Sequence, residues 1–358
     1  MAQIVLGIGT SHTPLLVIPP EKWHLYAQDD AKSLELVCPP DGWAMSYPEA
    51  VEYRSADIRA KARDLATFQA QSARCTAALD TMADTLAAVD ADVTVVISDD
   101  QDEWFFDDNM PCFSVYWGDT APLRPRTLPS RGDAELQRMI VEGYGGTARD
   151  VPVASKFGRH LIEYLMDHDF DLSHFTYVNE RHGGRVARRY PTRTGELDSA
   201  REIPDRVQGL PHGYSFVLSR LLTERSGPIL PVFQNTCYPP NVPSAGRCFD
   251  LGRAIGDAIR AWDDPARVAI IGSGGLSHFV VDEEFDQLLL DALAHKDAAA
   301  LRALPRHRMY SATSESLNWV TLGGAVHGTD LTMELLDYVP VYRSEAGTGG
   351  GWAFARWQ

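Results

Sequence analysis

Histidine, amide and carboxylate side chains follow three segments that have the apolar, β-branched composition of buried parallel strands. His12 comes after the first of these segments in IVLGIGTSHTP, and His278 closes the stretch GSGGLSH after residues 268–271. The acidic stretch DDQDE, residues 99–103, follows the strand-like residues 93–97. Because ligands bind outside the carboxyl ends of the strands in open parallel sheets, we expect these side chains to bind a metal ion or to transfer protons.

Two further candidates stand where helices are expected to begin. His212 lies in GLPHGYSF, and Glu315 lies in SATSESLNW after residues rich in Ser and Thr. A carboxylate in the first turn of a helix is stabilised by the helix dipole, so Glu315 taken alone fits a structural role as well as a place in a site. A single histidine such as His212, taken alone, fits a structural position in the core or on the surface better than a place in a site.

The glycines of GIGTSH suggest a dinucleotide-binding turn, but the pattern fails at the third glycine. His12 occupies that position, and no acidic residue ends a second strand about twenty residues later, as such a fold requires. The chain also lacks G-x-S-x-G, the nucleophile motif of α/β-hydrolases. The sequence therefore favours neither NAD binding nor a serine hydrolase.

The elements that must position these residues alternate between strands and helices, which predicts an α/β fold with a mostly parallel central sheet flanked by helices on both faces. The expected strands are residues 3–7, 92–98, 113–117, 171–178, 229–233 and 268–271. The expected helices are residues 55–88, 134–144, 155–167, 213–225, 248–262, 283–294 and 311–323.

We expect a single catalytic domain over residues 1–358, with a long insert at about 13–54 and a glycine-rich C-terminal tail at about 345–358. The tail is too rich in glycine for a helix or strand, so it is expected to be flexible or to cover a site with backbone amides. The basic stretch at 179–195 is expected to be a surface loop. Its arginines are either solvated or form a clamp for substrate: Arg185, Arg188 and Arg189.

The composition places the chain among cytoplasmic enzymes. Hydrophobic residues make up 44% and charged residues 23%, and the net charge of −16 argues against nucleic acid or an anionic membrane as a partner. The five cysteines include no C-x-x-C pair, which disfavours a disulfide framework or a cysteine-rich zinc site. No leader or membrane-spanning stretch is expected from the hydropathy pattern.

Five motifs occur in the order GIGTSHTP, GLPHGYSF, NTCYPPNVPSAGRCFDLGRAI, IIGSGGLSHFVVDEEFD and SESLNWVTLGGA, from residue 3 to about 326. In this order they resemble the class III extradiol ring-cleaving dioxygenases, the superfamily of the protocatechuate 4,5-dioxygenase catalytic subunit. The insert and the C-terminal AGTGGGWAFARW are closer to single-chain members of the 3-O-methylgallate dioxygenase type.

The resemblance implies a nonheme Fe(II) cofactor held by two histidines and one glutamate. His12 matches the first histidine and Glu315 matches the glutamate, while His278 matches the acid/base histidine and His212 a second catalytic histidine that contacts substrate or oxygen. Gln101 stands where the family has its second histidine ligand, and an amide is a weaker ligand than imidazole. Three outcomes remain open: Gln101 binds iron, Asp100 or Glu103 replaces it, or the metal site is weakened or lost. His24 in the insert has no local support as a ligand.

The implied reaction is ring opening of a catechol-type aromatic, such as protocatechuate, gallate or 3-O-methylgallate, with O₂. In that reaction His278 takes protons from the diol and later returns one. Two rival hypotheses remain: a Zn²⁺- or Mn²⁺-dependent C–C bond hydrolase or other non-oxidative lyase on the same fold, and a non-catalytic binding protein. The expected partners are a small aromatic diol and O₂, and a homodimer is the expected assembly.

Overall fold

The computed structural model describes residues 1–127, 134–179, 181–222 and 227–358. Over these residues the chain forms a central sheet of eight strands, with the inner four parallel to one another and antiparallel strands joined on both sides. In spatial order the strands are β13 (Met333–Tyr342), β14 (Gly349–Trp357), β1 (Gln3–Thr10), β12 (Arg267–Ser273), β4 (Val93–Asp99), β11 (Ile229–Gln234), β5 (Phe113–Tyr116) and β8 (Ser173–Phe175). The predicted α/β class and mostly parallel sheet are confirmed.

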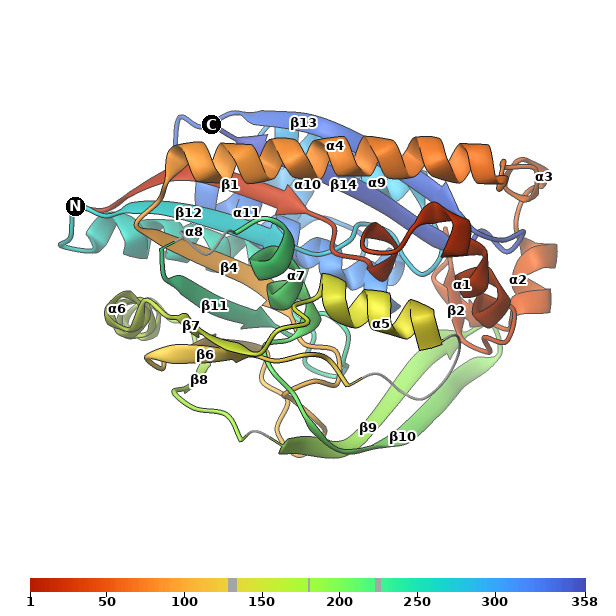
Figure 1. Ribbon diagram of the computed structural model, residues 1–358, viewed down its shortest axis with the longest axis horizontal. Coiled ribbons are helices and arrows are strands. Elements are labelled where there is room, and N and C mark those ends of the chain that lie inside the picture. Colours follow the sequence, from red (N-terminus) through yellow and green to blue (C-terminus); the bar gives the residue numbers. More distant parts are fainter. Residues whose placement is uncertain (128–133, 180, 223–226) are drawn as a thin grey trace.

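Helices cover both faces of this sheet, with α4 and α7 in front and α8 and α11 behind in the view of Figure 1. The helices are α1 (Trp23–Asp30), α2 (Tyr47–Tyr53), α3 (Ala56–Arg59), α4 (Leu65–Val89), α5 (Ala134–Gly143), α6 (Ser155–Asp167), α7 (His212–Arg220), α8 (Ala245–Ala261), α9 (Glu283–Ala294), α10 (Ala298–Arg302) and α11 (Ser316–His327). Short 3-10 turns occur at Pro14–Leu16, Pro20–Lys22, Arg306–Arg308 and Ser311–Glu315.

The inner strands are hydrophobic along their whole length because both faces of the sheet are covered. All seven residues of β4, sequence VTVVISD, are buried, and so are six of the seven residues of β12. On one side α4 packs against β13, β14 and β1, and on the other α11 packs against β12, β1 and β4. Since these strands are fixed between two layers, the turns that follow them have defined positions.

Three pairs of strands lie outside the central sheet. They are β2 (Leu36–Cys38) with β3 (Trp43–Met45), β6 (Thr120–Leu123) with β7 (Arg149–Pro152), and β9 (Arg181–Thr192) with β10 (Gly195–Val207). The first pair belongs to the predicted insert, which also contains α1 and α2. The long hairpin β9–β10 extends away from the central sheet, and its tip lies beside the insert (Figure 1).

The expected loop at 179–195 is wrong, because most of it is strand β9. Arginine and glycine have low β-propensity, but backbone pairing with β10 along the whole hairpin outweighs that preference. Of the three arginines, Arg188 points inward and donates to Asp102 at 2.7 Å, whereas Arg189 pairs with Asp198 across the hairpin at 2.8 Å. Arg185 is exposed.

The expectation that the glycine-rich tail forms no strand is also wrong, because residues 349–357 form β14 between β13 and β1. The glycines are needed for close packing rather than for flexibility. A Cβ at Gly351 would lie 1.8 Å from Asp286 Oδ2, and one at Gly349 would lie 1.7 Å from the carbonyl oxygen of Val341. The strand β13 was not foreseen.

Smaller differences concern helix boundaries. The helix expected at 55–88 is divided into α3 and α4, because Asp64 caps a new helix by accepting the backbone N–H of Thr67 at 2.9 Å. The helix expected at 311–323 begins as a 3-10 turn that ends at Glu315. The helix expected at 213–225 is α7, which ends earlier, at Arg220, and residues 223–226 lie outside the described residues. The assignment of residues 1–358 to one catalytic domain stays a prediction.

Candidate active site

The five candidate residues from the sequence line one cavity of about 270 Å³. The cavity lies at the carboxyl ends of β1, β4 and β12, where His12 and Gln101 each follow a strand by two residues. His212 begins α7, and Glu315 ends the turn that leads into α11. The side chains that follow the strands therefore lie close together, as expected, and His212 and Glu315 join them from the starts of two helices.

Three of these residues form a group that can hold a metal ion. The ligand atoms of His12, His212 and Glu315 all lie within 4.8 Å of one another, and all three residues are buried. The start of α7 can lie this close to His12 because its second residue is glycine: a Cβ at Gly213 would lie 2.1 Å from Ser98 Oγ and 2.9 Å from His12 Cε1. Two imidazoles and one carboxylate form a donor set that suits nonheme iron and also zinc.

The hydrogen bonds of His12 determine which of its ring nitrogens faces the cavity. Its Nδ1 lies 2.9 Å from Ser273 Oγ, and that hydroxyl donates its own proton to the carbonyl oxygen of Gly213. Nδ1 is therefore the donor, and Nε2 carries a lone pair. Burial, opposed by Glu315, lowers the pKa of His12 to about 3, so the imidazole is neutral.

The lone pair of His12 faces a carboxylate. Nε2 is buried without a hydrogen-bond partner among the described residues, and it lies 3.3 Å from Glu315 Oε2. Two acceptors that face each other at this distance are favourable only when a cation lies against both. The residues therefore fit a bound metal ion.

His212 is oriented by a buried carboxylate. Its Nδ1 lies 2.9 Å from Glu103 Oε2, and its backbone N–H donates to Glu103 Oε1 at 3.0 Å. Burial raises the pKa of Glu103, but His212 and Arg126 outweigh it and lower that pKa to about 2. Nδ1 then donates its proton to the carboxylate and leaves Nε2 for a ligand, which is the usual arrangement of a metal-binding histidine.

Glu315 is held by three donors. The backbone N–H of Gly275 donates to Oε2 at 2.8 Å, Gln101 Nε2 donates to Oε1 at 2.5 Å, and His278 Nε2 lies 3.1 Å from Oε1. Burial opposes ionisation, but the neighbouring imidazoles, His278 foremost, keep the pKa of Glu315 well below its usual range. Glu315 is therefore an anion at neutral pH.

His278 is placed between two acceptors. Its Nδ1 lies 3.0 Å from the carbonyl oxygen of Leu276, and its Nε2 faces Glu315. Burial opposes a charge on this ring, but Glu315 and the two hydrogen bonds raise its pKa above the usual value. His278 borders the cavity, so this arrangement can deliver or accept a proton there.

Gln101 contacts the site through its amide nitrogen. Besides Glu315, this nitrogen donates to Asp99 Oδ2 at 3.2 Å. Burial and the nearby Glu315 raise the pKa of Asp99 to about 7. To bind a metal, the amide would have to turn its oxygen toward Glu315, so Gln101 as the second ligand stays a prediction.

Asp100 and Glu103, which could replace Gln101 as a ligand, have partners of their own. Asp100 accepts the backbone N–H groups of the next turn, those of Glu103, Trp104 and Phe105, at 2.6–3.3 Å. Glu103 binds His212 and does not belong to the metal-binding group found among the described residues. His24 is exposed on α1 and does not line the cavity.

The cavity also contains residues that the sequence did not indicate. Tyr26 and Asp30 come from α1 in the insert, Arg126 from the segment after β6, and Arg343 from the end of β13. None of these lies in a periodic or strand-end pattern. The unusual length of the insert was the one signal that pointed to part of this set.

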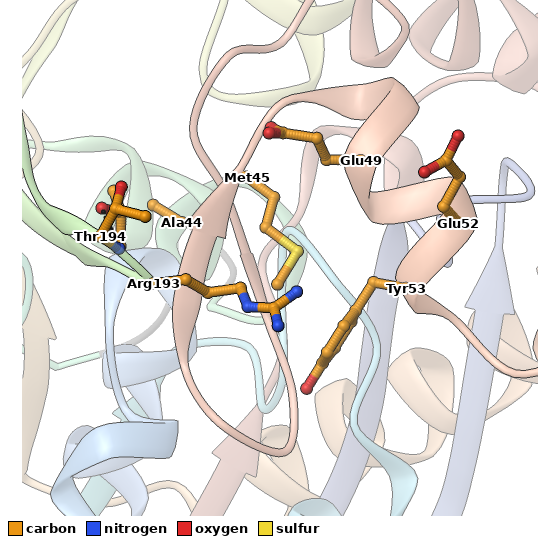
Figure 2. Close-up of a pocket in the computed structure, with 8 residues that line it drawn as sticks. Ala44, Met45, Glu49, Glu52, Tyr53, Arg193 and Thr194 are labelled. Atoms are coloured by element: carbon orange, nitrogen blue, oxygen red, sulfur yellow. Dashed lines mark hydrogen bonds between the residues drawn. The ribbon is translucent and has the colours of Figure 1, made fainter.

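A second groove, of about 620 Å³, lies between the insert and the tip of the β9–β10 hairpin. Figure 2 shows Met45, Tyr53 and Arg193 facing it, with Glu49 and Glu52 at its border. It contains no histidine or cysteine and shares no residue with the histidine-lined cavity. We therefore assign the chemistry to the histidine-lined cavity.

The α/β fold thus brings together two histidines and a glutamate, one after a strand and two at helix starts, in a buried group that can hold a metal ion. The family described as catalytic LigB subunit of aromatic ring-opening dioxygenase matches residues 70–348, and the chain belongs to this family. The matched span includes Gln101, His212, His278 and Glu315, and it begins after His12.

Two of the curated relatives show how far the similarity extends. A gallate dioxygenase of Pseudomonas putida is 29% identical over 164 residues, 42% of this chain and 39% of the relative. A 2,3-dihydroxyphenylpropionate/2,3-dihydroxicinnamic acid 1,2-dioxygenase of Comamonas testosteroni is 28% identical over 165 residues, 46% of this chain and 39% of the relative. The aligned part thus spans about two fifths of either relative. No helix in the described parts of the chain has the length and apolar character of a membrane span.

Proposed function

We propose that this chain is a nonheme Fe(II)-dependent extradiol dioxygenase that opens the ring of a catechol-type aromatic with O₂. One observation carries the proposal: the lone pair of His12 Nε2 faces Glu315 at 3.3 Å, beside His212. Family membership and the names of both relatives support the reaction class.

His12 and Glu315 are the proposed metal ligands. For the third position, His212 is favoured in the observed arrangement because its Nε2 is left free by Glu103, whereas the amide nitrogen of Gln101 is turned toward carboxylates. When bound, ferrous ion supplies the means to hold a diol and O₂ together and to pass electrons between them.

The protein residues supply positioning and proton transfer. His278 borders the cavity with its ring between two acceptors, and we propose that Nε2 first releases its proton to solvent, then takes a proton from a diol hydroxyl and returns that proton to the product. Phe279 and Trp352 line the same cavity and supply apolar surface for a flat ring. A volume of about 270 Å³ suits a substrate with a single ring, since typical ligand pockets begin near ~300 Å³.

The test is anaerobic reconstitution with Fe(II), followed by measurement of oxygen uptake with a panel of catechols. The proposal predicts one O₂ consumed per catechol and a ring-opened product that contains both oxygen atoms. If iron binds and no catechol in the panel consumes oxygen, the reaction class is wrong.

The same donor set also suits Zn²⁺, which keeps a non-oxidative C–C bond hydrolase or lyase as the second candidate. Zinc-loaded and iron-loaded protein should therefore be compared with and without oxygen. Substrate loss in the zinc form under anaerobic conditions would favour the second candidate.

A further inference from the structure

A buried acidic side chain lies behind the segment that carries His278. Asp286, on α9, is 0% exposed and does not line the histidine-lined cavity. Within the described parts of the chain, its carboxyl group has two hydrogen-bond partners, Ser277 and Tyr338. A buried carboxyl group is costly unless its oxygens accept hydrogen bonds, so these contacts decide what Asp286 does in the fold.

Two of the three donors to Asp286 belong to one residue. The backbone N–H of Ser277 donates to Oδ1 at 2.7 Å, and the hydroxyl of the same residue donates to Oδ2 at 2.6 Å. The third donor is the hydroxyl of Tyr338 on β13, which donates to Oδ2 at 2.7 Å. Asp286 therefore holds both the backbone and the side chain of Ser277, the residue that precedes His278.

Ser277 is also fixed from two other directions. The backbone N–H of Asp282, the residue before α9, donates to Ser277 Oγ at 2.8 Å. The backbone N–H of Gly351 on β14 donates to the carbonyl oxygen of Ser277 at 2.8 Å. A Cβ at Gly351 would lie 1.8 Å from Asp286 Oδ2 and 3.1 Å from Ser277 Oγ, so this close approach requires glycine. Ser277 is thus held by a helix and a strand at once.

The position of the His278 ring depends on the segment that Ser277 anchors. One acceptor of the ring, the carbonyl oxygen of Leu276, belongs to this segment, and the other is Glu315 Oε1 at 3.1 Å. On the far side, the hydroxyl of Thr313 accepts from the backbone N–H of His278 at 3.0 Å. Proton transfer requires the imidazole to lie within hydrogen-bond reach of the reacting group, and a displacement of about 1 Å can cost about 100-fold in rate.

We propose that Asp286 is a positioning residue for proton transfer, which acts through Ser277 to fix His278 Nε2 beside Glu315 and the cavity. Asp286 contacts the segment and not the ring, so its contribution is geometric. This inference rests on the proposed function for the role of His278, whereas the contact between Asp286 and Ser277 is a property of the fold itself.

The first test measures kcat and KM separately with Fe(II)-loaded protein and a catechol. Asp286→Ala should lower kcat by about 10- to 100-fold, the usual cost of a small displacement near the reacting atoms. The KM for the catechol and the iron content should change by less than about twofold, the margin for sites that do not interact. Asp286→Asn keeps the shape and an acceptor for the Ser277 N–H, so it should restore most of kcat.

Tyr338→Phe is the matched control, because it removes the one donor to Asp286 that does not belong to Ser277. It should change kcat by less than about twofold. A loss of kcat in Tyr338→Phe as large as in Asp286→Ala would overturn the proposal, since any damage around this buried carboxyl group would then slow the enzyme. If Asp286→Ala does not fold, Ser277→Ala removes the hydroxyl contact alone and should lower kcat by about three- to tenfold.

A double-mutant cycle separates positioning from general support of the fold. In a His278→Ala background, Asp286→Ala should lower kcat by less than about twofold, because the ring that Asp286 positions is already absent. The same loss of kcat in both backgrounds would mean that Asp286 does not act through His278, and the proposal would fail.

Crystal structures of the metal-free proteins separate this inference from the proposed function. The distance between His278 Nε2 and Glu315 Oε1, 3.1 Å in the wild type, should exceed about 3.5 Å in Asp286→Ala or Ser277→Ala, and Tyr338→Phe should leave it unchanged. An unmoved ring in both variants would overturn the proposal. If the ring moves as expected but the wild-type protein consumes no oxygen with any catechol, the positioning role stands and the dioxygenase proposal fails.

Discussion

The two sides of the cavity are built in different ways. The inner wall comes from strand ends and helix starts, and we define it as His12, Gln101, His212, His278 and Glu315. The outer wall comes from the insert, the segment after β6 and the end of β13, and we define it as Tyr26, Asp30, Arg126 and Arg343. Each inner-wall side chain forms at least one hydrogen bond or ion pair within the protein, whereas the two arginines of the outer wall are paired with Asp30 and Glu103.

This contrast separates chemistry from selectivity. Within the inner wall, His12 Nε2 is the buried atom without a hydrogen-bond partner among the described residues, and it points at the place for a cation. In the outer wall, Arg343 and Arg126 border the cavity with their charges paired to Asp30 and Glu103. Changes to the inner wall should therefore affect metal binding or turnover for every substrate, and changes to the outer wall should affect the choice among substrates.

The largest effect on iron binding is expected when His12 or Glu315, the two proposed ligands that face each other, is replaced. His12→Ala and Glu315→Ala should each abolish iron binding, because each removes one of two acceptors that face each other at 3.3 Å. The measurement is iron content after anaerobic reconstitution. His24→Ala is the matched control, since His24 is exposed and outside the cavity, and it should keep its iron. Normal iron content in either ligand variant would contradict the assignment.

The next largest effect is expected for His278. His278→Ala should retain iron but lose about two to four orders of magnitude in turnover, the usual span of acid–base catalysis. Steady-state oxygen uptake, normalised to bound iron, measures this loss. Turnover close to the wild-type rate would remove His278 from the proton-transfer role.

A smaller effect is expected for Glu103, which orients His212. Glu103→Gln should weaken iron binding by about 10- to 100-fold, as is usual for partners that orient a metal-binding histidine. A direct titration of iron under anaerobic conditions measures the affinity. An unchanged iron affinity would mean that His212 does not bind the metal and acts on substrate or oxygen instead.

The substitution Glu103→Gln should also change how the free energy of unfolding depends on pH. The pKa of Glu103 is lowered from 4.5 to about 2 in the folded protein, so its charge stabilises the fold fully above pH 4.5, and this contribution is lost as the pH falls toward 2. Wild type should exceed Glu103→Gln by about 1–3 kcal/mol in the free energy of unfolding at pH 7. Urea denaturation should show that this difference in the free energy of unfolding becomes smaller below pH 4.5. A difference that does not change with pH would contradict a negative charge on Glu103.

Among the inner-wall residues, Gln101 is expected to have the smallest effect on iron affinity. With His212 as third ligand, Gln101→Ala should change iron affinity by less than about tenfold, the low end for a group that only contacts a ligand. Gln101→His should bind iron at least as tightly as the wild type. A large loss in Gln101→Ala together with retained iron in His212→Ala would assign the third position to Gln101.

The inner wall could be predicted from sequence because its positions follow from strand geometry. The β-branched runs before His12, Gln101 and His278 identify buried parallel strands, and the ends of such strands meet at one edge of a sheet. Glu315 and His212 were candidates only as polar residues at expected helix starts, and the resemblance to a known family then gave each a role in the site. What the sequence could not give was the orientation of each donor, since the Ser273 hydrogen bond of His12 joins residues 261 positions apart.

The outer wall could not be predicted, because no local pattern marks it. Arg126 lies in an irregular segment, and Arg343 gains its role from Asp30, which is 313 residues away. The strand β14 was missed for a related reason: its glycines fill places where no side chain fits, which local propensity does not describe. Tertiary packing decides both features.

The most direct test of the account is simultaneous measurement of iron binding and oxygen uptake on the wild-type protein. Anaerobic reconstitution should give one Fe(II) per chain that is lost in His12→Ala, and addition of a catechol in air should consume one O₂ per diol. Iron retained without His12, or bound iron with no oxygen uptake for any diol, would contradict the central claim.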